Sequence, residues 1–120
     1  MTQGREADVR IREAGDRPDA PAAGTWAGHG LGERATLVQF SSAFCQPCRA
    51  TRRVLAEVAE MVPGVAHVEI DAEAELDLVR ELGILKTPTV LVLDADGQVV
   101  RRATGQPRRI DVIAALGEAV

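Results

Sequence analysis

Four segments of the chain have the hydrophobic pattern of β-strands. Residues 35–40 and 89–93 are almost continuously apolar, which is typical of strands buried on both faces of a sheet. Residues 65–70 instead alternate between apolar and polar positions, as expected of a strand with one exposed side. Residues 98–103 follow the second apolar run after an Asp-Ala-Asp-Gly turn at 94–97, and this arrangement predicts an antiparallel hairpin.

Three further segments have helical spacing. The first runs from about Arg49 to Val62 and is ended by a Pro-Gly pair. Asp71 is a suitable cap for the second, which Gly83 ends, and Pro107 lies near the expected first position of the third. The residues expected on the buried faces are Val54, Leu55, Val58, Ala59 and Val62 in the first helix, Leu78, Val79 and Leu82 in the second, and Ile110, Ile113, Ala114 and Leu116 in the third.

The resulting order, β-α-β-α-β-β-α, predicts an α/β fold for residues 34–120. Right-handed crossovers and a terminal hairpin give a central mixed β-sheet. Helices on both faces are needed to bury the continuously apolar strands. The length of 120 residues suits one domain of this kind.

Residues 1–33 differ in composition and are expected to form an N-terminal extension that is largely loop or flexible. They hold six of the eleven glycines and two of the six prolines. Val9 and Ile11 alternate with charged residues and could form a short edge strand. Trp26 favours a different interpretation, in which this stretch docks on an edge of the core together with Leu31.

Composition argues against two classes of partner. The net charge of −4 and an aromatic content of 2% disfavour nucleic-acid binding, which needs basic charge and stacking surfaces. No apolar run approaches the roughly 20 residues that span a bilayer, and the N-terminus lacks the apolar core of a signal peptide. As written, the sequence indicates a soluble, cytoplasmic protein without membrane contact. The alternative is an extracytoplasmic domain from which an N-terminal anchor was removed.

Both cysteines lie in one motif, Cys45-Gln46-Pro47-Cys48, between the first predicted strand and helix. The free N–H groups and positive dipole end of a helix start stabilise a thiolate, so this placement favours redox chemistry. A disulfide closing so short a loop would stabilise the fold little. Structural zinc needs four ligands, and only His29 and His67 remain, so we expect no metal.

These features together resemble the thioredoxin family over about residues 35–118. The resemblance rests on strand–Cys-x-x-Cys–helix, on Thr87-Pro88 before an apolar strand, on the Asp-x-Asp-Gly hairpin and on Gly105 after the last strand. It implies a thioredoxin-like fold and a thiol–disulfide oxidoreductase that reduces protein disulfides. Cys45 would be the nucleophile and Cys48 the resolving thiol. Pro88 would be cis and face the disulfide, and Thr87 and Pro88 would bind substrate.

The sequence departs from the usual thioredoxin pattern around this motif. Phe44 replaces a tryptophan, and it could still cover the disulfide; Gln46-Pro47 replaces Gly-Pro. Phe44, Gln46 and Pro47 are therefore assigned to substrate binding with Thr87 and Pro88.

Two further replacements lie beneath the cysteines. Gln39 stands where the family buries a carboxylate, and His67 stands where it has a lysine. One hypothesis makes His67 the proton acceptor for Cys48, through water, because its ordinary pKa suits neutral pH. The alternative is a structural histidine satisfied by Gln39 or Glu69.

The resemblance also implies partners. We expect a monomer with no bound cofactor, acting on protein disulfides and receiving electrons from a separate reductase or a membrane donor. Two alternatives remain at this point: a more oxidising enzyme that forms disulfides, and a redox-inactive module that binds peptides. Arg49, Arg52 and Arg53 form a basic cluster next to the motif, interpreted as a solvated helix face balanced by Glu57 and Glu60.

Overall fold

The computed structural model describes residues 25, 26 and 28–120. The short strand predicted around Val9 and Ile11 lies outside the described residues. The elements follow in the order β1 (Ala35–Ser41), α1 (Gln46–Met61), β2 (Val65–Asp71), α2 (Leu76–Leu82), β3 (Thr89–Asp94), β4 (Val99–Thr104) and α3 (Arg109–Ala119). This order is the one that the hydrophobic pattern predicts.

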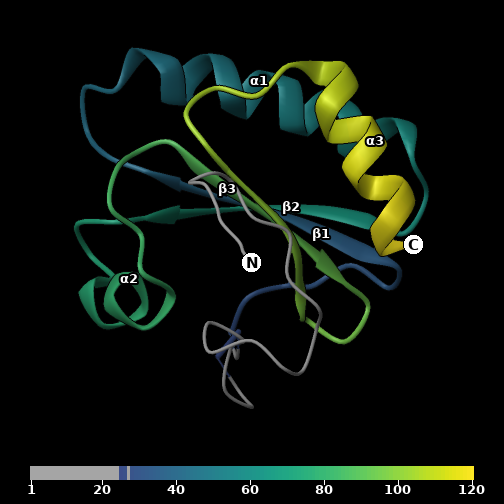
Figure 1. Cartoon of the computed structure of the whole chain (residues 1–120), viewed down its shortest axis with the longest axis horizontal. Helices are drawn as coiled ribbons and strands as arrows, with labels where there is room; N and C mark the ends of the chain where they lie inside the picture. Colours follow the sequence, from purple (N-terminus) through teal and green to yellow (C-terminus); the bar gives the residue numbers. More distant parts are fainter. Residues whose placement is uncertain (1–24, 27) are drawn as a thin grey trace, which may run out of the picture.

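The four strands form one mixed sheet with the order β2-β1-β3-β4 (Figure 1). β1 runs parallel to β2 and antiparallel to β3, and β3 pairs antiparallel with β4 across the hairpin. β1 is therefore a central strand, and all seven of its residues are buried. Its continuously apolar sequence follows from this position, since both of its faces are covered.

Helices cover both faces of the sheet, as predicted (Figure 1). α1 and α3 lie on one face, where Ala35 and Leu37 of β1 pack against Leu55 of α1 and Val112 of α3. α2 lies on the other face, which receives Phe40 and the neighbouring even-numbered positions of β1. Residues 35, 37, 39 and 41 thus point towards α1, and this alternation decides what lies beneath the cysteines.

Trp26 belongs to the core on the α2 face, where it is buried and packs with Leu31. Its Nε1 donates a hydrogen bond of 2.9 Å to the carbonyl of Gly97, in the β3–β4 turn. Gly97 has a φ of 81°, and a Cβ there would lie 3.1 Å from the indole Cδ1. The turn and the docked indole therefore both require glycine at this position.

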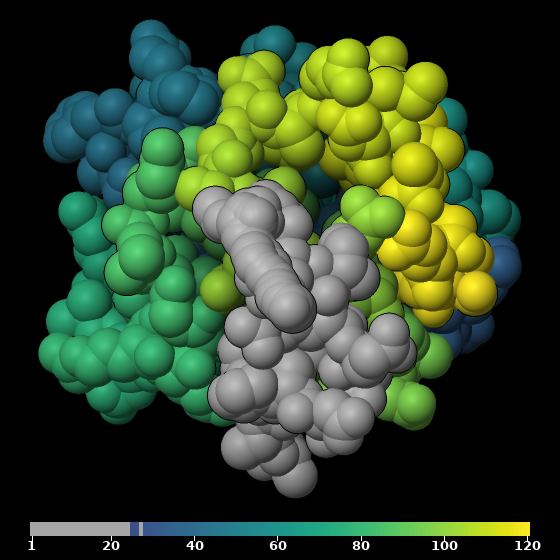
Figure 2. Space-filling view, in the orientation of Figure 1, coloured from purple at the N-terminus to yellow at the C-terminus, as the bar shows by residue number. Residues whose placement is uncertain are grey.

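The predicted buried face of α3 is wrong except for Leu116, and the predicted Ala114 is exposed. Ile110 and Ile113 are exposed, and the buried residues of α3 are Val112, Ala115, Leu116 and Ala119. The helix is apolar on two opposite sides, so its periodicity alone does not select the buried one. The side carrying Ile110 and Ile113 faces outward on a helix that lies at the molecular surface (Figure 2).

Three predicted helix ends also need correction. α1 begins at Gln46, one turn earlier than the expected Arg49, because Cys45 is its N-cap. Asp71 does not cap α2: it ends β2, its side chain accepts a hydrogen bond from the Glu73 N–H, and the cap position is Glu75. Pro107 precedes α3, whose N-cap is Arg108. Gly83 ends α2 in the left-handed conformation, as predicted.

Within the part of the chain that the structure describes, none of the helices has the length and apolar character needed to cross a bilayer.

Candidate active site

Cys45 and Cys48 form a disulfide at the junction of β1 and α1, with their Cα atoms 5.2 Å apart. The Cys48 N–H donates to the Cys45 Sγ over 3.2 Å, so the cap group of this helix is a sulfur atom. Pro47 occupies the first turn, where a missing N–H costs little because those donors have no partner within the helix. The helix start is therefore arranged to stabilise negative charge on the Cys45 sulfur.

The two cysteines differ in exposure. Cys45 is half-buried, whereas Cys48 is 1% exposed. An incoming molecule can therefore reach the sulfur of Cys45, while that of Cys48 is accessible only from Cys45. This asymmetry matches the roles of an attacking and a resolving thiol.

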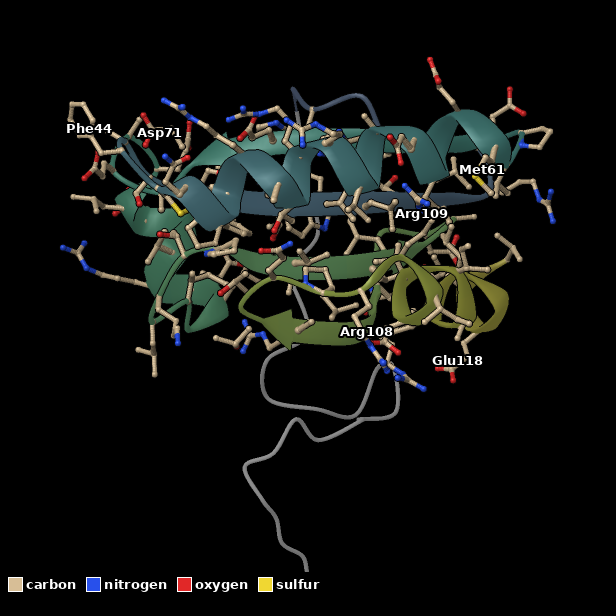
Figure 3. All side chains as sticks on the ribbon, turned by 90° about the horizontal axis from the view of Figure 1, so that it is seen from above. Phe44, Met61, Asp71, Arg108, Arg109 and Glu118 are labelled. Carbon is tan, nitrogen blue, oxygen red and sulfur yellow. A yellow bond between two sulfur atoms is a disulfide. The ribbon has the colours of Figure 1, made fainter. Side chains whose placement is uncertain are left out.

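Phe44 does not cover the disulfide, contrary to the expectation from sequence. Its φ of 60° places it in the left-handed region, and its side chain is 99% exposed. Figure 3 shows the ring at one end of the molecule, pointing away from the ribbon. Gln46 and Pro47, the two residues between the cysteines, are also exposed.

The Thr87-Pro88 peptide bond is cis, as predicted. The side-chain hydroxyls of Thr87 and Ser42 are hydrogen-bonded at 2.7 Å, which joins the loop before β3 to the loop before the cysteines. Pro88 is buried, and its carbonyl accepts a hydrogen bond of 2.8 Å from the Gly105 N–H. Three of the four sequence motifs, at the cysteines, at Thr87-Pro88 and at Gly105, thus meet at one end of the sheet.

Gln39 is fully buried directly beneath the cysteine loop. Its Nε2 donates to the Cys48 carbonyl over 2.8 Å and to the Ser41 Oγ over 2.9 Å. Its Oε1 lies 3.3 Å from the His67 Nε2. Because an amide oxygen only accepts, this contact makes Nε2 the protonated ring nitrogen of His67.

Two titrating groups of this region have shifted pKa values. Burial lowers the pKa of His67, and Arg52 acts in the same direction while Glu69 opposes it. The pKa of Glu69 is lowered chiefly by its hydrogen bonds with Arg52, assisted by Ser41. The neutral imidazole and the ionised carboxylate are the favoured forms near neutral pH.

A family model described as Thioredoxin matches residues 30–118 of the chain. The chain belongs to the thioredoxin family. The disulfide at the β1–α1 junction and the cis proline supply the family's redox centre in this fold, and together they support thiol–disulfide oxidoreductase activity.

Two thioredoxins illustrate the sequence similarity. The chain is 32% identical over 69 residues to Thioredoxin-2 of Pyricularia oryzae, covering 58% of this chain and 40% of that protein. It is 28% identical over 88 residues to thioredoxin of Mycobacterium tuberculosis, covering 72% and 75% of the two chains.

Solved thioredoxin structures share the fold. Chloroplastic thioredoxin z superposes with a TM-score of 0.63 at 27% identity, covering 72% of this chain and 79% of that one. A mutant thioredoxin from Halobacterium salinarum gives a TM-score of 0.66 at 21% identity, with 72% and 75% coverage.

The protein has a polar hollow next to its disulfide loop. The hollow has a volume of about 360 Å³ and is lined by Ser41, Ser42, Ala43, Arg52, Glu69 and Asp71. Phe44 and Asp71 lie at the same end of the molecule (Figure 3). Among the described residues, no group of three or more His, Cys, Asp or Glu side chains is placed to hold a metal ion.

Sequence reasoning missed Ser41 and misjudged Arg52. Arg52 is not balanced by glutamates of its own helix: its Nε and Nη2 each donate to Glu69 of β2 over 2.7 Å. The sequence carried no signal for these contacts, because they depend on the parallel pairing that puts Gln39 of β1 opposite Glu69 of β2. The register that creates this pair is not visible in either strand alone.

Proposed function

We propose that this member of the thioredoxin family reduces protein disulfides, with Cys45 as the nucleophile and Cys48 as the resolving thiol. The Cys45 thiolate attacks one sulfur of the substrate disulfide; that bond breaks, and the departing substrate thiolate takes a proton from solvent. Cys48 then loses its proton and attacks the Cys45 sulfur, releasing the second substrate thiol. Two electrons pass to the substrate, and the Cys45–Cys48 disulfide is formed.

The observation that carries this proposal is the difference in exposure between two sulfurs at one helix start. Cys45 is half-buried at the N-cap and receives the Cys48 N–H, while Cys48 is 1% exposed. Only one of the two thiols is therefore available to a large substrate, and the helix end favours its ionised form.

We further propose that Phe44, Gln46, Pro47, Thr87 and Pro88 bind the substrate. The first three are exposed beside the disulfide, and the hydroxyl contact between Ser42 and Thr87 holds the Thr87-Pro88 loop against the cysteine loop. Exposed backbone and apolar side chains in this arrangement suit an extended peptide. Reduction of the resulting disulfide is assigned to a separate reductase or membrane donor.

Trapping the mixed disulfide tests the two cysteine roles. Cys48→Ser is expected to accumulate a covalent complex with insulin that dithiothreitol releases, whereas Cys45→Ser forms none. The wild-type protein should complete insulin reduction with dithiothreitol as the electron source. A complex formed by Cys45→Ser, or wild-type protein without activity, would overturn the proposal.

A measured reduction potential tests the direction of the reaction. A value near about −270 mV is expected for a reductase, and one near about −120 mV would instead indicate an enzyme that forms disulfides.

For His67 we propose a proton-accepting role that operates through water. Its Nε2 faces the Gln39 oxygen, so the free lone pair is on Nδ1. Turnover of His67→Gln should lose the wild-type pH dependence between about pH 5.5 and 8. An unchanged profile would discard this role and leave a structural histidine.

A further inference from the structure

A continuous chain of hydrogen bonds connects the backbone of Cys48 to the protein surface. It starts at the Cys48 carbonyl and passes through the Gln39 amide to the Ser41 hydroxyl. The Ser41 Oγ lies 2.8 Å from the Glu69 Oε2, and Arg52 binds both oxygens of Glu69 at 2.7 Å. Gln39 and Ser41 are buried, whereas Arg52 and Glu69 line the polar hollow beside the disulfide loop.

The chemistry of Glu69 fixes the direction of this chain. A carboxylate only accepts, so the single O–H of Ser41 donates to Glu69. The Ser41 oxygen must then accept from Gln39, and only the NH₂ end of that amide can donate. The Gln39 oxygen is left to face His67, which must carry a proton on Nε2.

The opposite orientation of the Gln39 amide is unfavourable at two of its contacts. A rotated amide would bring its oxygen against the Cys48 carbonyl and the acceptor side of Ser41, in a position that is 0% exposed. Buried acceptors facing one another have no proton to share. The Cys48 carbonyl and, through Ser41, the Glu69 carboxylate therefore both hold the Gln39 amide in this orientation.

We propose that Glu69, paired with Arg52, is a positioning residue for Cys48. By accepting the Ser41 proton, Glu69 allows the Gln39 NH₂ group to bond to Ser41 and to the Cys48 carbonyl at once, and this arrangement keeps His67 in the Nε2–H tautomer. This proposal rests on the proposed role of Cys48 as the resolving thiol. In this proposal Glu69 and Arg52 act on Cys48 through Ser41 and Gln39, without contacting a cysteine sulfur.

The step that depends on this positioning is the attack of Cys48 on the mixed disulfide. Cys48 is buried, so its sulfur reaches Cys45 only through the geometry of the first turn of α1. The Gln39 bond holds the backbone of that turn from below. Misplacing a reacting group by a fraction of an ångström is costly in rate, so loss of this bond should slow resolution by about tenfold. The first attack, by the exposed Cys45, should be unaffected.

Glu69→Gln is the decisive variant because it reverses the hydrogen bond between residue 69 and Ser41. Arg52 would keep the amide oxygen of the new side chain, and its NH₂ would face Ser41. Ser41 would then donate towards Gln39, so Ser41 and the Cys48 carbonyl would make opposite demands on the Gln39 amide, which weakens its bond to Cys48. Glu73→Gln, an exposed glutamate of the next loop that makes none of these contacts, is the matched control.

Two measurements on the full chain test the proposal. Nitrogen-15 NMR of the ring reports the His67 tautomer, and rapid-quench kinetics with a disulfide-containing peptide separates formation of the mixed disulfide from its resolution. We expect Glu69→Gln to weaken the Nε2–H preference and to resolve about tenfold more slowly, with formation unchanged. Arg52→Lys, which keeps a cation beside the carboxylate, should preserve the tautomer, and Glu73→Gln should match the wild type in both measurements.

A folded Glu69→Gln with an unchanged tautomer, or with an unchanged resolution rate, would overturn the proposal. Should that variant fail to fold, Ser41→Ala breaks the same chain of hydrogen bonds. A wild-type rate of resolution in Ser41→Ala would overturn the proposal equally. The proposed function fails in a different way, through a wild-type protein that forms no mixed disulfide at Cys45. The His67 tautomer still tests the chain of hydrogen bonds in that case.

Discussion

Phe44 combines a left-handed backbone with an almost completely exposed aromatic ring. Its φ is 60° and its side chain is 99% exposed, immediately before the reactive cysteine. A non-glycine residue in this region costs about 1–2 kcal/mol, and the exposed ring recovers little of that by burial. The conformation turns the chain from β1 into α1, which explains why the ring does not lie over the disulfide.

Replacing Phe44 with glycine should therefore stabilise the fold. We expect Phe44→Gly to raise the free energy of unfolding by up to about 1 kcal/mol, since glycine adopts a positive φ freely but gains entropy in the unfolded chain. Phe44→Ala keeps the backbone cost and is the control. Urea denaturation of the oxidised proteins measures both; equal stabilities of the two variants would contradict a backbone origin.

The lowered pKa of His67 predicts a loss of stability in mild acid. The folded protein binds the proton less readily than the unfolded chain, whose histidine keeps the ordinary value of 6.5. The contribution of His67 is thus complete above about pH 6.5 and decreases as the pH falls through the lower folded-state pKa. His67→Gln should show a smaller difference in urea midpoint between about pH 7.5 and 5. Equal differences in variant and wild type would exclude His67 as the cause.

The residues of the site differ in how far sequence could predict them. Cys45, Cys48 and Pro88 could be predicted because each lies in a short motif with a fixed place in the fold. Ser41 and Arg52 could not, because their partner Glu69 reaches them only through the β1–β2 register and the rotation of α1. Contacts between elements depend on packing, which local spacing does not contain.

At the scale of elements, strands were easier to predict than the orientation of helices. The continuous apolar run of β1 specified a central strand, and the Asp-Ala-Asp-Gly turn specified the hairpin. α3 carries apolar residues on opposite sides, and only its contacts with β3, β4 and α1 select Val112 and Leu116 over Ile110 and Ile113. A two-sided pattern leaves the choice to tertiary structure.

Two glycines, one at a helix end and one inside a helix, should respond in opposite ways to substitution by alanine. Gly83 ends α2 with a φ of 65°, and a Cβ there would meet nothing within 4 Å, so Gly83→Ala should cost about 1 kcal/mol through its backbone alone. Gly117 lies inside α3 with equally open surroundings, so Gly117→Ala should stabilise by about 0.5–1 kcal/mol. Thermal unfolding of the two variants compares them, and changes of the same sign would refute the argument.

For the whole molecule, Trp26 ties the segment before β1 to the far turn of the sheet. Trp26→Phe should cost about 1 kcal/mol, because it removes the hydrogen bond to Gly97 but keeps an aromatic ring. Trp26→Ala should cost about 3–5 kcal/mol, since it also empties a buried position of the core. Circular dichroism during urea unfolding gives both values.

Thr25→Ala, which removes an exposed hydrogen bond to Glu81, is the neighbouring control and should cost less than Trp26→Phe. An alanine variant as stable as the wild type would show that the docked segment is dispensable.

The location of the indole also determines what intrinsic fluorescence can report about this protein. Trp26 is the single tryptophan of the chain and contacts the turn at Gly97, beside the strand end where Asp94 pairs with Ala35. Cys45 follows the other end of β1, and seven strand residues extend over about 20 Å. Intrinsic fluorescence should therefore follow denaturation with the same signal in the oxidised and reduced proteins. An optical readout of the redox state would need a fluorophore attached close to Phe44.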